Sequence, residues 1–310
     1  MLNNTVYFDS DLGDDERRRL LYQGQIFMFS PTPATLALKD FAYEMITQAF
    51  APHDPLTAQY DMPVERFVEI FGPLKPTFMH HPRTRELLRR ILIDLRCDVE
   101  QTYLDVPRFR GVTSHGYLTS GVGFAHHPHR DTWWAAPLAQ LNWWLPLVDI
   151  ASESSMAFHP RYFEEGVVNH SEEFNYYEWN SVGRAEAAKH ISADTRRQPK
   201  PDPDILLDPQ VRLVGKPGSV IAFAAAQMHS TVPNTTGTTR FSIDFRTVNV
   251  ADLRAGLAVR NVDSHPSGTS LRDFRRVDDD SAMPQDVVDL YDSGRESFDD
   301  AALVFQPGRR

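Results

Sequence analysis

The sequence has little cysteine, no excess of basic charge and no long apolar run. Its single cysteine is Cys97, so the 310 residues contain neither a disulfide framework nor a metal site built from several cysteines. The 42 acidic residues outnumber the 32 basic ones, the formal net charge is −10, and the basic residues form no continuous stripe. These features exclude a typical surface for nucleic acid or for an anionic membrane. We therefore expect a small-molecule partner, with no nucleic acid and no membrane.

The lack of long apolar stretches also indicates where in the cell the protein is expected. No run approaches the roughly 18 residues needed to cross a bilayer, and the first residues have neither the basic nor the apolar region of a signal peptide. We expect a cytoplasmic protein. With 41% hydrophobic residues, the chain can bury a sizeable core, and we expect a single catalytic domain over residues 1–310.

The first part of the chain, residues 1–108, is predicted to be mostly helical. Thr32 and Pro33 are typical of an N-cap and a first helical turn, and the helix they begin should run through Phe50 and end near Pro52. Apolar residues at steps of three and four predict a second helix from about Pro82 to Leu104. We expect these helices to pack outside a sheet.

In residues 109–250, short apolar runs are separated by segments that contain Gly, Pro, Asn and Ser. They predict strands at Arg110–Ser114, Gly121–Ala125, Ala139–Asp149, Gly218–Ala224 and Arg240–Val248. This pattern is typical of a β-sandwich or barrel core. The polar segment 164–209 is predicted to be an insert, part loop and part short helix from Val182 to Ile191, of the kind that often forms a lid or binding loop. Residues 251–310 are predicted to be an acidic, irregular tail with a solvated or partly disordered terminus.

A histidine and an aspartate two residues apart, His129 and Asp131, lie in the stretch "HPHRDTWW". On an extended segment they point to the same side, so both can reach one metal ion. Iron(II) used for oxygen chemistry is typically bound by two imidazoles and one carboxylate on one face of an octahedron. The best candidate for the third ligand is His229, which follows the strongly apolar run that begins at Gly218.

The strand after His229 places polar residues on one side. Arg240, Ser242, Asp244 and Arg246 alternate with Phe241, Ile243 and Phe245. A strand with two arginines on its inner side lines an anion-accepting cavity or faces solvent.

This order of residues resembles the ligand pattern of iron(II)/2-oxoglutarate-dependent dioxygenases, particularly the phytanoyl-CoA dioxygenase-like family. The resemblance implies a mainly β fold with flanking α-helices: a double-stranded β-helix (jelly-roll, cupin-like) core with helices packed on one side. It implies that His129, Asp131 and His229 bind Fe(II). It also implies that Arg240 pairs with the far carboxylate of 2-oxoglutarate, with Ser242 as the accessory hydroxyl. O2 would be the second co-substrate.

The reaction that the resemblance implies is hydroxylation of an unactivated C–H bond, with succinate and carbon dioxide formed from 2-oxoglutarate. Related halogenases lack the carboxylate ligand, so Asp131 favours hydroxylation or another oxidative outcome such as desaturation, ring formation or oxidative cleavage. Three rivals stay open: a metal-dependent cupin with other chemistry, a non-catalytic ligand-binding or sensor protein, and a hydroxylase of proteins. A small polar metabolite, such as an amino-acid-derived biosynthetic intermediate, is the expected substrate.

Several neighbours are candidates for contacts with the co-substrate or substrate. Gln140 and Asn142 share one strand side with Trp144, and we expect the two amides to bind 2-oxoglutarate or substrate. One of Trp133 and Trp134 should form a pocket wall, and packing alone is an equally good interpretation for any single tryptophan. The other candidate substrate contacts are Trp144, on the cavity side of its strand, His159 and Arg246. The alternative for His159 is an ordinary hydrogen-bonded histidine, and the alternatives for Arg246 are a structural ion pair and a second anchor for 2-oxoglutarate. His126 and His127 are expected to be polar loop residues or to support the ligands.

Overall fold

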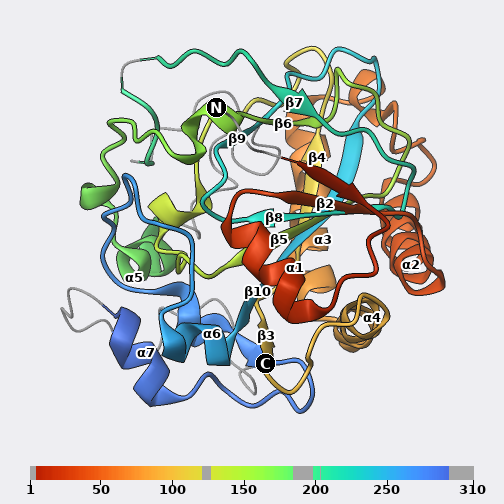
Figure 1. Cartoon of the computed structure of the whole chain (residues 1–310). Helices are drawn as coiled ribbons and strands as arrows, with labels where there is room; N and C mark the ends of the chain where they lie inside the picture. The colour runs from red at the N-terminus through yellow and green to blue at the C-terminus, as the bar shows by residue number, and fades with distance from the viewer. Residues whose placement is uncertain (1–4, 121–126, 184–197, 203, 293–310) are drawn as a thin grey trace.

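A computed structural model describes residues 5–120, 127–183, 198–202 and 204–292. The helices are α1 (Asp14–Tyr22), α2 (Pro33–Phe50), α3 (Val64–Met79), α4 (Pro82–Asp94), α5 (Tyr176–Glu178), α6 (Val250–Ala255) and α7 (Gln285–Tyr291). The strands are β1 (Val6–Phe8), β2 (Ile26–Phe29), β3 (Thr102–Leu104), β4 (Arg108–Val112), β5 (Leu141–Pro146), β6 (Met156–Phe158), β7 (Val211–Arg212), β8 (Val220–Ala224), β9 (His229–Thr231), β10 (Arg240–Asn249) and β11 (Arg275–Arg276). Figure 1 shows their arrangement.

The strands form a large and a small sheet. The large sheet has the order β1-β2-β8-β5-β10-β3-β11, with β4 also paired to β10, and the small sheet has the order β7-β6-β9. All pairs in both sheets are antiparallel except β1 with β2. The long strand β10 pairs with both β4 and β5, so the polar side chains that alternate along it lie beside those of two neighbours.

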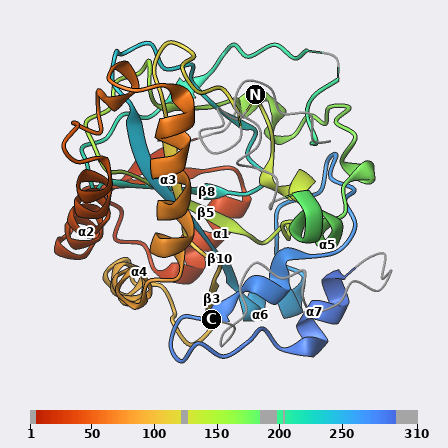
Figure 2. The ribbon, with the colours of Figure 1, turned by 180° about the vertical axis from the view of Figure 1, so that it is seen from behind.

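One face of the large sheet is covered by helices. Phe241, Ile243 and Phe245 of β10 are fully buried in one apolar cluster, together with the inner faces of α2, α3 and α4. Figure 2, the view from behind, shows α3 crossing this face with α2 and α4 beside it. Burial of so many large apolar side chains stabilises the fold and fixes which face of β10 points away from the helices.

The small sheet packs toward the other face of the large sheet. Met156 and Phe158 of β6 share a buried cluster with Trp144 of β5 and with Ile221 and Phe223 of β8. Polar residues of β10 lie on this same side, because they alternate with the residues that face the helices. A site that involves β9 and β10 is therefore positioned between the two sheets.

The sequence predicts some element boundaries well and others poorly. The helix from Pro33 to Phe50 is confirmed, with Thr32 as its N-cap. The second helix begins at Pro82 as predicted but ends at Asp94, and residues 102–104 form β3 instead of continuing the helix. The strand prediction at Gly121–Ala125 and most of the helix prediction at Val182–Ile191 lie outside the described residues.

The described chain is a mixed helix-and-sheet structure, less dominated by strands than predicted, because helices α1 to α4 lie beside the large sheet. Strands β1, β2 and β3 also lie within the part that was predicted to be mostly helical. The tail is regular in part, because α6 and α7 form there, and it contributes to a buried apolar cluster that includes Leu253, Leu271, Phe274 and Val287. The acidic composition of this segment gave no sign of that cluster. Of the described helices, none has both the length and the apolarity that a membrane span requires.

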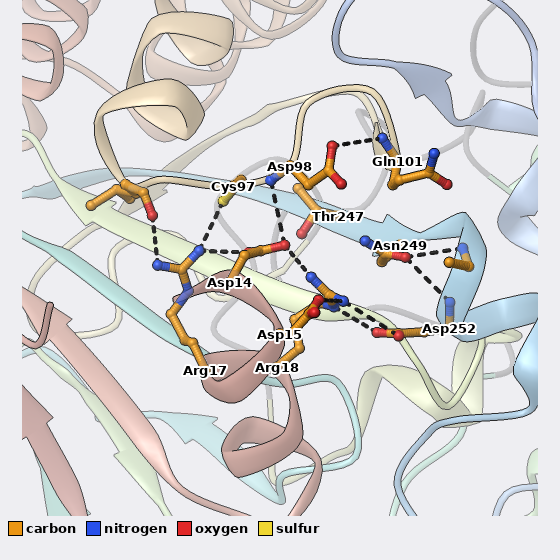
Figure 3. Close-up of polar contacts among 12 residues, drawn as sticks. Asp14, Asp15, Arg17, Arg18, Cys97, Asp98, Gln101, Thr247, Asn249 and Asp252 are labelled. Carbon is orange, nitrogen blue, oxygen red and sulfur yellow. Dashed lines mark hydrogen bonds and ion pairs between the residues drawn. The ribbon is translucent and has the colours of Figure 1, made fainter. Parts of the chain in front are cut away.

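A charged cluster joins α1 to two distant segments (Figure 3). The Arg18 guanidinium donates to Asp252 Oδ2 of α6 at 2.6 Å and also to Asp14. Arg17 donates to the carbonyl of Leu95 at 2.5 Å, just beyond α4. These buried contacts replace water around both guanidinium groups and hold α1 against the chain on either side of it.

Candidate metal and co-substrate site

Two histidines 100 positions apart form an isolated antiparallel bridge. The backbone N–H of His129 donates to the carbonyl of His229 at 2.9 Å, and the return bond is 3.0 Å long. His229 begins β9, and Asp131 begins a short 3-10 helix two residues after His129. The fold therefore brings the three predicted ligands together, with ligand atoms within 4.8 Å of one another. Within the described ranges, no other set of three His, Cys, Asp or Glu side chains is gathered in this way.

Hydrogen bonds to the backbone fix the tautomer of both imidazoles. Nδ1 of His129 lies 2.8 Å from the carbonyl oxygen of His127, and Nδ1 of His229 lies 2.9 Å from that of Gln227. A carbonyl oxygen only accepts, so each Nδ1 carries the proton and each Nε2 presents a lone pair. These Nε2 atoms lie 3.3 Å and 3.9 Å from Oδ1 of Asp131. Lone pairs from both rings and a carboxylate oxygen thus converge, as a divalent metal requires.

The two oxygens of Asp131 have different surroundings. Oδ1 faces the histidines, whereas Oδ2 accepts hydrogen bonds from Nδ2 of Asn142 and from Nε of Arg246, both at 3.0 Å. Gln140 in turn donates to Oδ1 of Asn142 at 2.9 Å. This chain of contacts orients the carboxylate and leaves one oxygen free to face the candidate metal position.

Burial and neighbouring charges keep His229 and Asp131 in the protonation states that a metal needs. Burial lowers the pKa of His229 to about 3, helped by the proximity of His129, so the ring is neutral at pH 7. Burial by itself would raise the pKa of Asp131, but His129, His229 and Arg108 outweigh it and lower the value to about 2. A neutral imidazole and an ionised carboxylate are the metal-binding forms.

Arg240 is a buried cation beside this centre. It is 4% exposed, its Cζ lies 5.4 Å from the centre of the Trp144 ring, and its Nε has no hydrogen-bond partner in the described structure. Burial lowers its pKa to about 10, with a further contribution from Arg110. The hydroxyl of Ser242, next but one on β10, is also buried without a partner. An unpaired buried donor costs free energy, so this position suits an acidic ligand.

The candidate ligands and Arg240 line one cavity of about 420 Å³. It is bordered by α3, β4, β5, β9 and β10, and by the segment that carries α5. Its other described charged side chains are Lys75, Asp105, Arg108, Arg110, Asp244 and Arg246, and its aromatic ones include Trp134, Trp144, Tyr176 and Trp179. Such a volume lies within the range of small-molecule sites.

The tryptophan pair divides between cavity and core. Trp134 lines the cavity and packs edge-on against Trp179 at 5.3 Å. Trp133 is fully buried away from the cavity, where its indole N–H donates to Asp263 at 2.8 Å. Trp144 lines the cavity as predicted. The adjacent tryptophans occupy a 3-10 turn, in which successive side chains point in different directions.

Other predicted contacts are placed differently from expectation. His159 does not line the cavity, and its two nitrogens contact the Leu207 carbonyl and the Ser230 hydroxyl, each at 2.9 Å, as in the hydrogen-bonded alternative given for it. Arg246 lines the cavity but makes the alternative ion pair, with Asp131. Gln140 and Asn142 also line the cavity, and their amides are engaged with each other and with Asp131. Their contact with the co-substrate stays a prediction.

His127 supports a ligand without joining the set. Its carbonyl accepts from His129, and its own Nε2 lies 3.0 Å from the carbonyl of Pro199. Burial lowers its pKa to about 4. This agrees with the expected supporting role. His126 lies outside the described residues.

Several cavity residues were missed from the sequence. Tyr176 and Trp179 come from the predicted insert, whose "NYYEWN" composition was the available signal. Lys75 and Arg108 come from residues 1–108, which were predicted to be mostly helical, and Arg110 begins a predicted strand. Alternation of arginine with an apolar residue over 108–110 was the signal for the two arginines. Only pairing of β4 with β10 shows that these arginines face Asp244 and its neighbours.

A buried ion pair anchors the loop between the ligands. Nε of Arg130 donates to both oxygens of Asp263, at 3.0 Å and 3.1 Å, and Nη1 donates to the carbonyl of Ala226 at 2.7 Å. Its Nη2 donates to the carbonyls of Tyr162 and Glu165. The residue between the two predicted ligands is therefore tied to three other segments of the chain.

Comparisons with known proteins found similar solved structures but no sequence relatives. No family model matches the chain, and no curated protein matches it. EvdO2 from Micromonospora carbonacea var. aurantiaca, solved with 2-oxoglutarate, is 14% identical with a TM-score of 0.36, over 56% of this chain and 62% of EvdO2. The epimerase SnoN, solved with Fe3+, alpha ketoglutarate and nogalamycin RO, is 14% identical with a TM-score of 0.39, over 76% and 83%.

A third structure, AviO1 from Streptomyces viridochromogenes Tue57, is 12% identical with a TM-score of 0.40, over 78% of this chain and 97% of AviO1. For EvdO2, in contrast, the chain spans less than two thirds of that protein's length. At these identities and TM-scores, the function of this chain has to be argued from its own residues.

Proposed function

We propose that this protein is a non-haem oxygenase that depends on iron(II) and 2-oxoglutarate and hydroxylates an unactivated C–H bond of a small polar metabolite, such as an amino-acid-derived biosynthetic intermediate. The observation that carries the proposal is the presence, in one cavity, of a two-histidine, one-carboxylate set and an unpaired buried arginine. The first suits a divalent metal and the second suits the carboxylate of a co-substrate.

The donor set fits iron(II). Two imidazole nitrogens and one carboxylate oxygen leave further coordination positions for other ligands. His129, Asp131 and His229 would hold the metal. A structural zinc site would favour four protein ligands, and the described residues supply three.

Arg240 fits the far carboxylate of 2-oxoglutarate. Its planar guanidinium can bind a carboxylate through two parallel hydrogen bonds, and its unpaired Nε together with the Ser242 hydroxyl offers donors at that place. Trp144 covers the guanidinium and excludes water from it. Arg240 and the three predicted metal ligands line the same cavity. A co-substrate that binds the metal at one end and the arginine at the other needs this arrangement.

In the proposed reaction, the protein mainly positions the reactants and contributes little acid-base catalysis. When bound, iron(II) would allow O2 to accept four electrons, two from 2-oxoglutarate, which becomes succinate and carbon dioxide, and two from the C–H bond of the substrate. Asn142 and Arg246 hold Oδ2 of Asp131, so the carboxylate keeps one orientation. Trp134 and Trp179 line the cavity with aromatic surface, which would limit the access of water to the reacting atoms.

The two sheets support a finer proposal about the fold. We propose that they are the two halves of a double-stranded β-helix within a single catalytic domain. The apolar cluster shared by β5, β6 and β8, and the bridge between His129 and His229, are the contacts expected between such halves.

The test is anaerobic addition of 2-oxoglutarate to iron(II)-loaded protein, followed by visible spectroscopy. A metal-to-ligand charge-transfer band is expected for wild type. In Arg240→Met, the concentration of 2-oxoglutarate at half-maximal band should rise about 10- to 100-fold, the loss expected for a charge-assisted hydrogen bond. Arg66→Met is the matched control, because Arg66 is an exposed arginine of α3. Absence of the band in wild type would contradict the proposal.

A further inference from the structure

Three of the described side chains that line the cavity have a buried polar atom without a hydrogen-bond partner in the described structure. These atoms are Nε of Arg240, Nε1 of Trp134 and Oγ of Ser270. Buried polar groups are nearly always paired in proteins, because an unpaired one loses its contacts with water and gains none in return. The proposed function assigns Arg240 to 2-oxoglutarate, and it leaves Trp134 and Ser270 unexplained.

The indole N–H of Trp134 differs from those of two other tryptophans. Trp133 and Trp143 are buried, and each donates at 2.8 Å to a side-chain oxygen, of Asp263 and of Thr247 respectively. The ring of Trp134 instead packs edge-on against the rings of Phe174 and Trp179, with centres 5.3 Å apart in both pairs. These contacts hold the ring without using its N–H, which stays available to a ligand in the cavity.

Ser270 is held beside Trp134 by the backbone. Its N–H donates at 3.1 Å to the carbonyl of Ala135, the residue directly after Trp134. Only 7% of Ser270 is exposed, and its hydroxyl has no partner among the described residues. The two unpaired groups therefore come from neighbouring backbone segments and line the same cavity.

This pair of side chains lies next to a predicted metal ligand. Asp131 and Trp134 are the first and last residues of one short 3-10 helix. Side chains three residues apart are eclipsed in a 3-10 helix, so these two point to the same side of the turn, and both line the cavity. A ligand group bound by Trp134 is therefore placed beside Asp131.

The chemistry of the pair suits an uncharged oxygen. An indole N–H only donates, whereas a serine hydroxyl donates or accepts, so the bound atom has to be a hydrogen-bond acceptor. Neither Trp134 nor Ser270 carries a charge. A buried carboxylate or phosphate needs a cation beside it, and a carbonyl or hydroxyl oxygen does not.

We propose that the substrate carries an uncharged oxygen, of a carbonyl or a hydroxyl group, which accepts a hydrogen bond from Nε1 of Trp134 and pairs with the hydroxyl of Ser270. This inference rests on the proposed function, since that function assigns Arg240 to the co-substrate. Trp134 and Ser270 then determine specificity, because an analogue without the oxygen leaves both groups buried and unpaired. The bound oxygen also directs the neighbouring C–H bonds of the substrate toward the side of the cavity that carries Asp131.

The test uses three probes with one carbon skeleton: acetophenone, which has a carbonyl, 1-phenylethanol, which has a hydroxyl, and ethylbenzene, which has no oxygen. Each is titrated calorimetrically and anaerobically into iron(II)-loaded protein saturated with 2-oxoglutarate, while the charge-transfer band reports that 2-oxoglutarate stays bound. Ser270→Ala should weaken at least one oxygen-containing probe about three- to tenfold, the effect of one lost hydrogen bond, and should leave ethylbenzene unchanged. The probe that is weakened distinguishes a carbonyl from a hydroxyl.

Trp134→Phe tests the other half of the pair. The phenyl ring keeps an aromatic surface but lacks the N–H, so the affinity for the same probe should fall about three- to tenfold relative to that for ethylbenzene. The inference is overturned if neither oxygen-containing probe binds wild type, or if the two variants change the affinities for all three probes equally.

Stability separates this binding role from a structural one. Ser155 provides the matched control, because it is also buried but donates at 2.6 Å to the carbonyl of Leu213 and does not line the cavity. Ser155→Ala should lower the midpoint of chemical denaturation and leave the probes unchanged, whereas Ser270→Ala should keep the midpoint of wild type. An equal loss in the two variants would show that the Ser270 hydroxyl serves the fold and would overturn the inference. Failure of the proposed function is a different result: the charge-transfer band does not form in wild type.

Discussion

Nε of Arg246 donates a hydrogen bond of 3.0 Å to Oδ2 of Asp131, the oxygen that faces away from the two histidines. The same guanidinium lies 3.6 Å from Asp105 and 3.5 Å from Asp244. A residue that was a candidate substrate contact therefore orients a predicted metal ligand.

Replacing Arg246 by methionine should weaken iron(II) binding about 10- to 100-fold, the usual effect of losing a partner that orients a ligand. The measurement is competition with a chromophoric chelator under anaerobic conditions. Arg254→Met is the control, because Arg254 is an exposed arginine paired only with Asp286 among the described residues. An affinity equal to that of wild type would show that Asp131 keeps its orientation without Arg246.

Asp263→Asn should lower the free energy of unfolding by about 3–5 kcal/mol, because it leaves the guanidinium of Arg130 buried without a charge partner. Chemical denaturation of the metal-free protein measures this. Glu165→Gln removes the partner of an exposed pair with Arg161 and should cost less than about 1 kcal/mol. Similar losses in the two variants would contradict the role given to the Arg130–Asp263 pair.

Lys75→Met should stabilise the metal-free protein, most strongly below pH 7. The folded pKa of Lys75 is about 7, below its ordinary value of 10.5, so the unfolded chain binds the proton more tightly. The cost of the buried charge is complete below pH 7 and disappears as pH rises toward 10.5. Each unit of lowered pKa corresponds to about 1.4 kcal/mol. Unfolding curves of both proteins at pH 6 and pH 9 test this, and an equal difference at the two pH values would contradict it.

The adjacent tryptophans should respond differently to substitution. Trp133→Phe should lower the free energy of unfolding by about 1–3 kcal/mol, because Asp263 loses a buried hydrogen-bond donor. Trp134→Phe should change stability less, because Trp134 lines the cavity and its indole N–H has no hydrogen-bond partner in the described structure. Chemical denaturation of both variants separates the two roles, and an equal or larger loss in Trp134→Phe would contradict the assignment.

The candidate site was predictable where local pattern and order along the chain carry the information. His129 and Asp131 are two residues apart, and His229 follows a strand long enough to be seen in the sequence. The alternation of polar and apolar residues along β10 predicted which side chains share a face, and Arg240 is buried on the polar face. Thr32 predicted the start of α2 because an N-cap acts on residues directly after it.

The remaining features depend on contacts between distant segments. Nothing near His159 in the sequence shows that Leu207 and Ser230 engage its two nitrogens. Apolar spacing after Asp94 continues the helical pattern, but the chain leaves the helix and Arg96 takes a left-handed conformation with φ of 56°. The aspartate of the Arg130–Asp263 pair comes from the segment interpreted as an irregular tail, where acidic composition was a poor guide to burial.

The two reciprocal backbone hydrogen bonds between His129 and His229 affect how the site takes up a metal ion. Since folding itself brings these residues together, the entropy of closing a 100-residue loop is lost before any ion arrives. Metal uptake should then proceed with a small heat-capacity change and an association rate that does not depend on slow rearrangement of the chain. The apoprotein is in this sense preorganised, and its affinity for the ion should be set by ligand chemistry and desolvation.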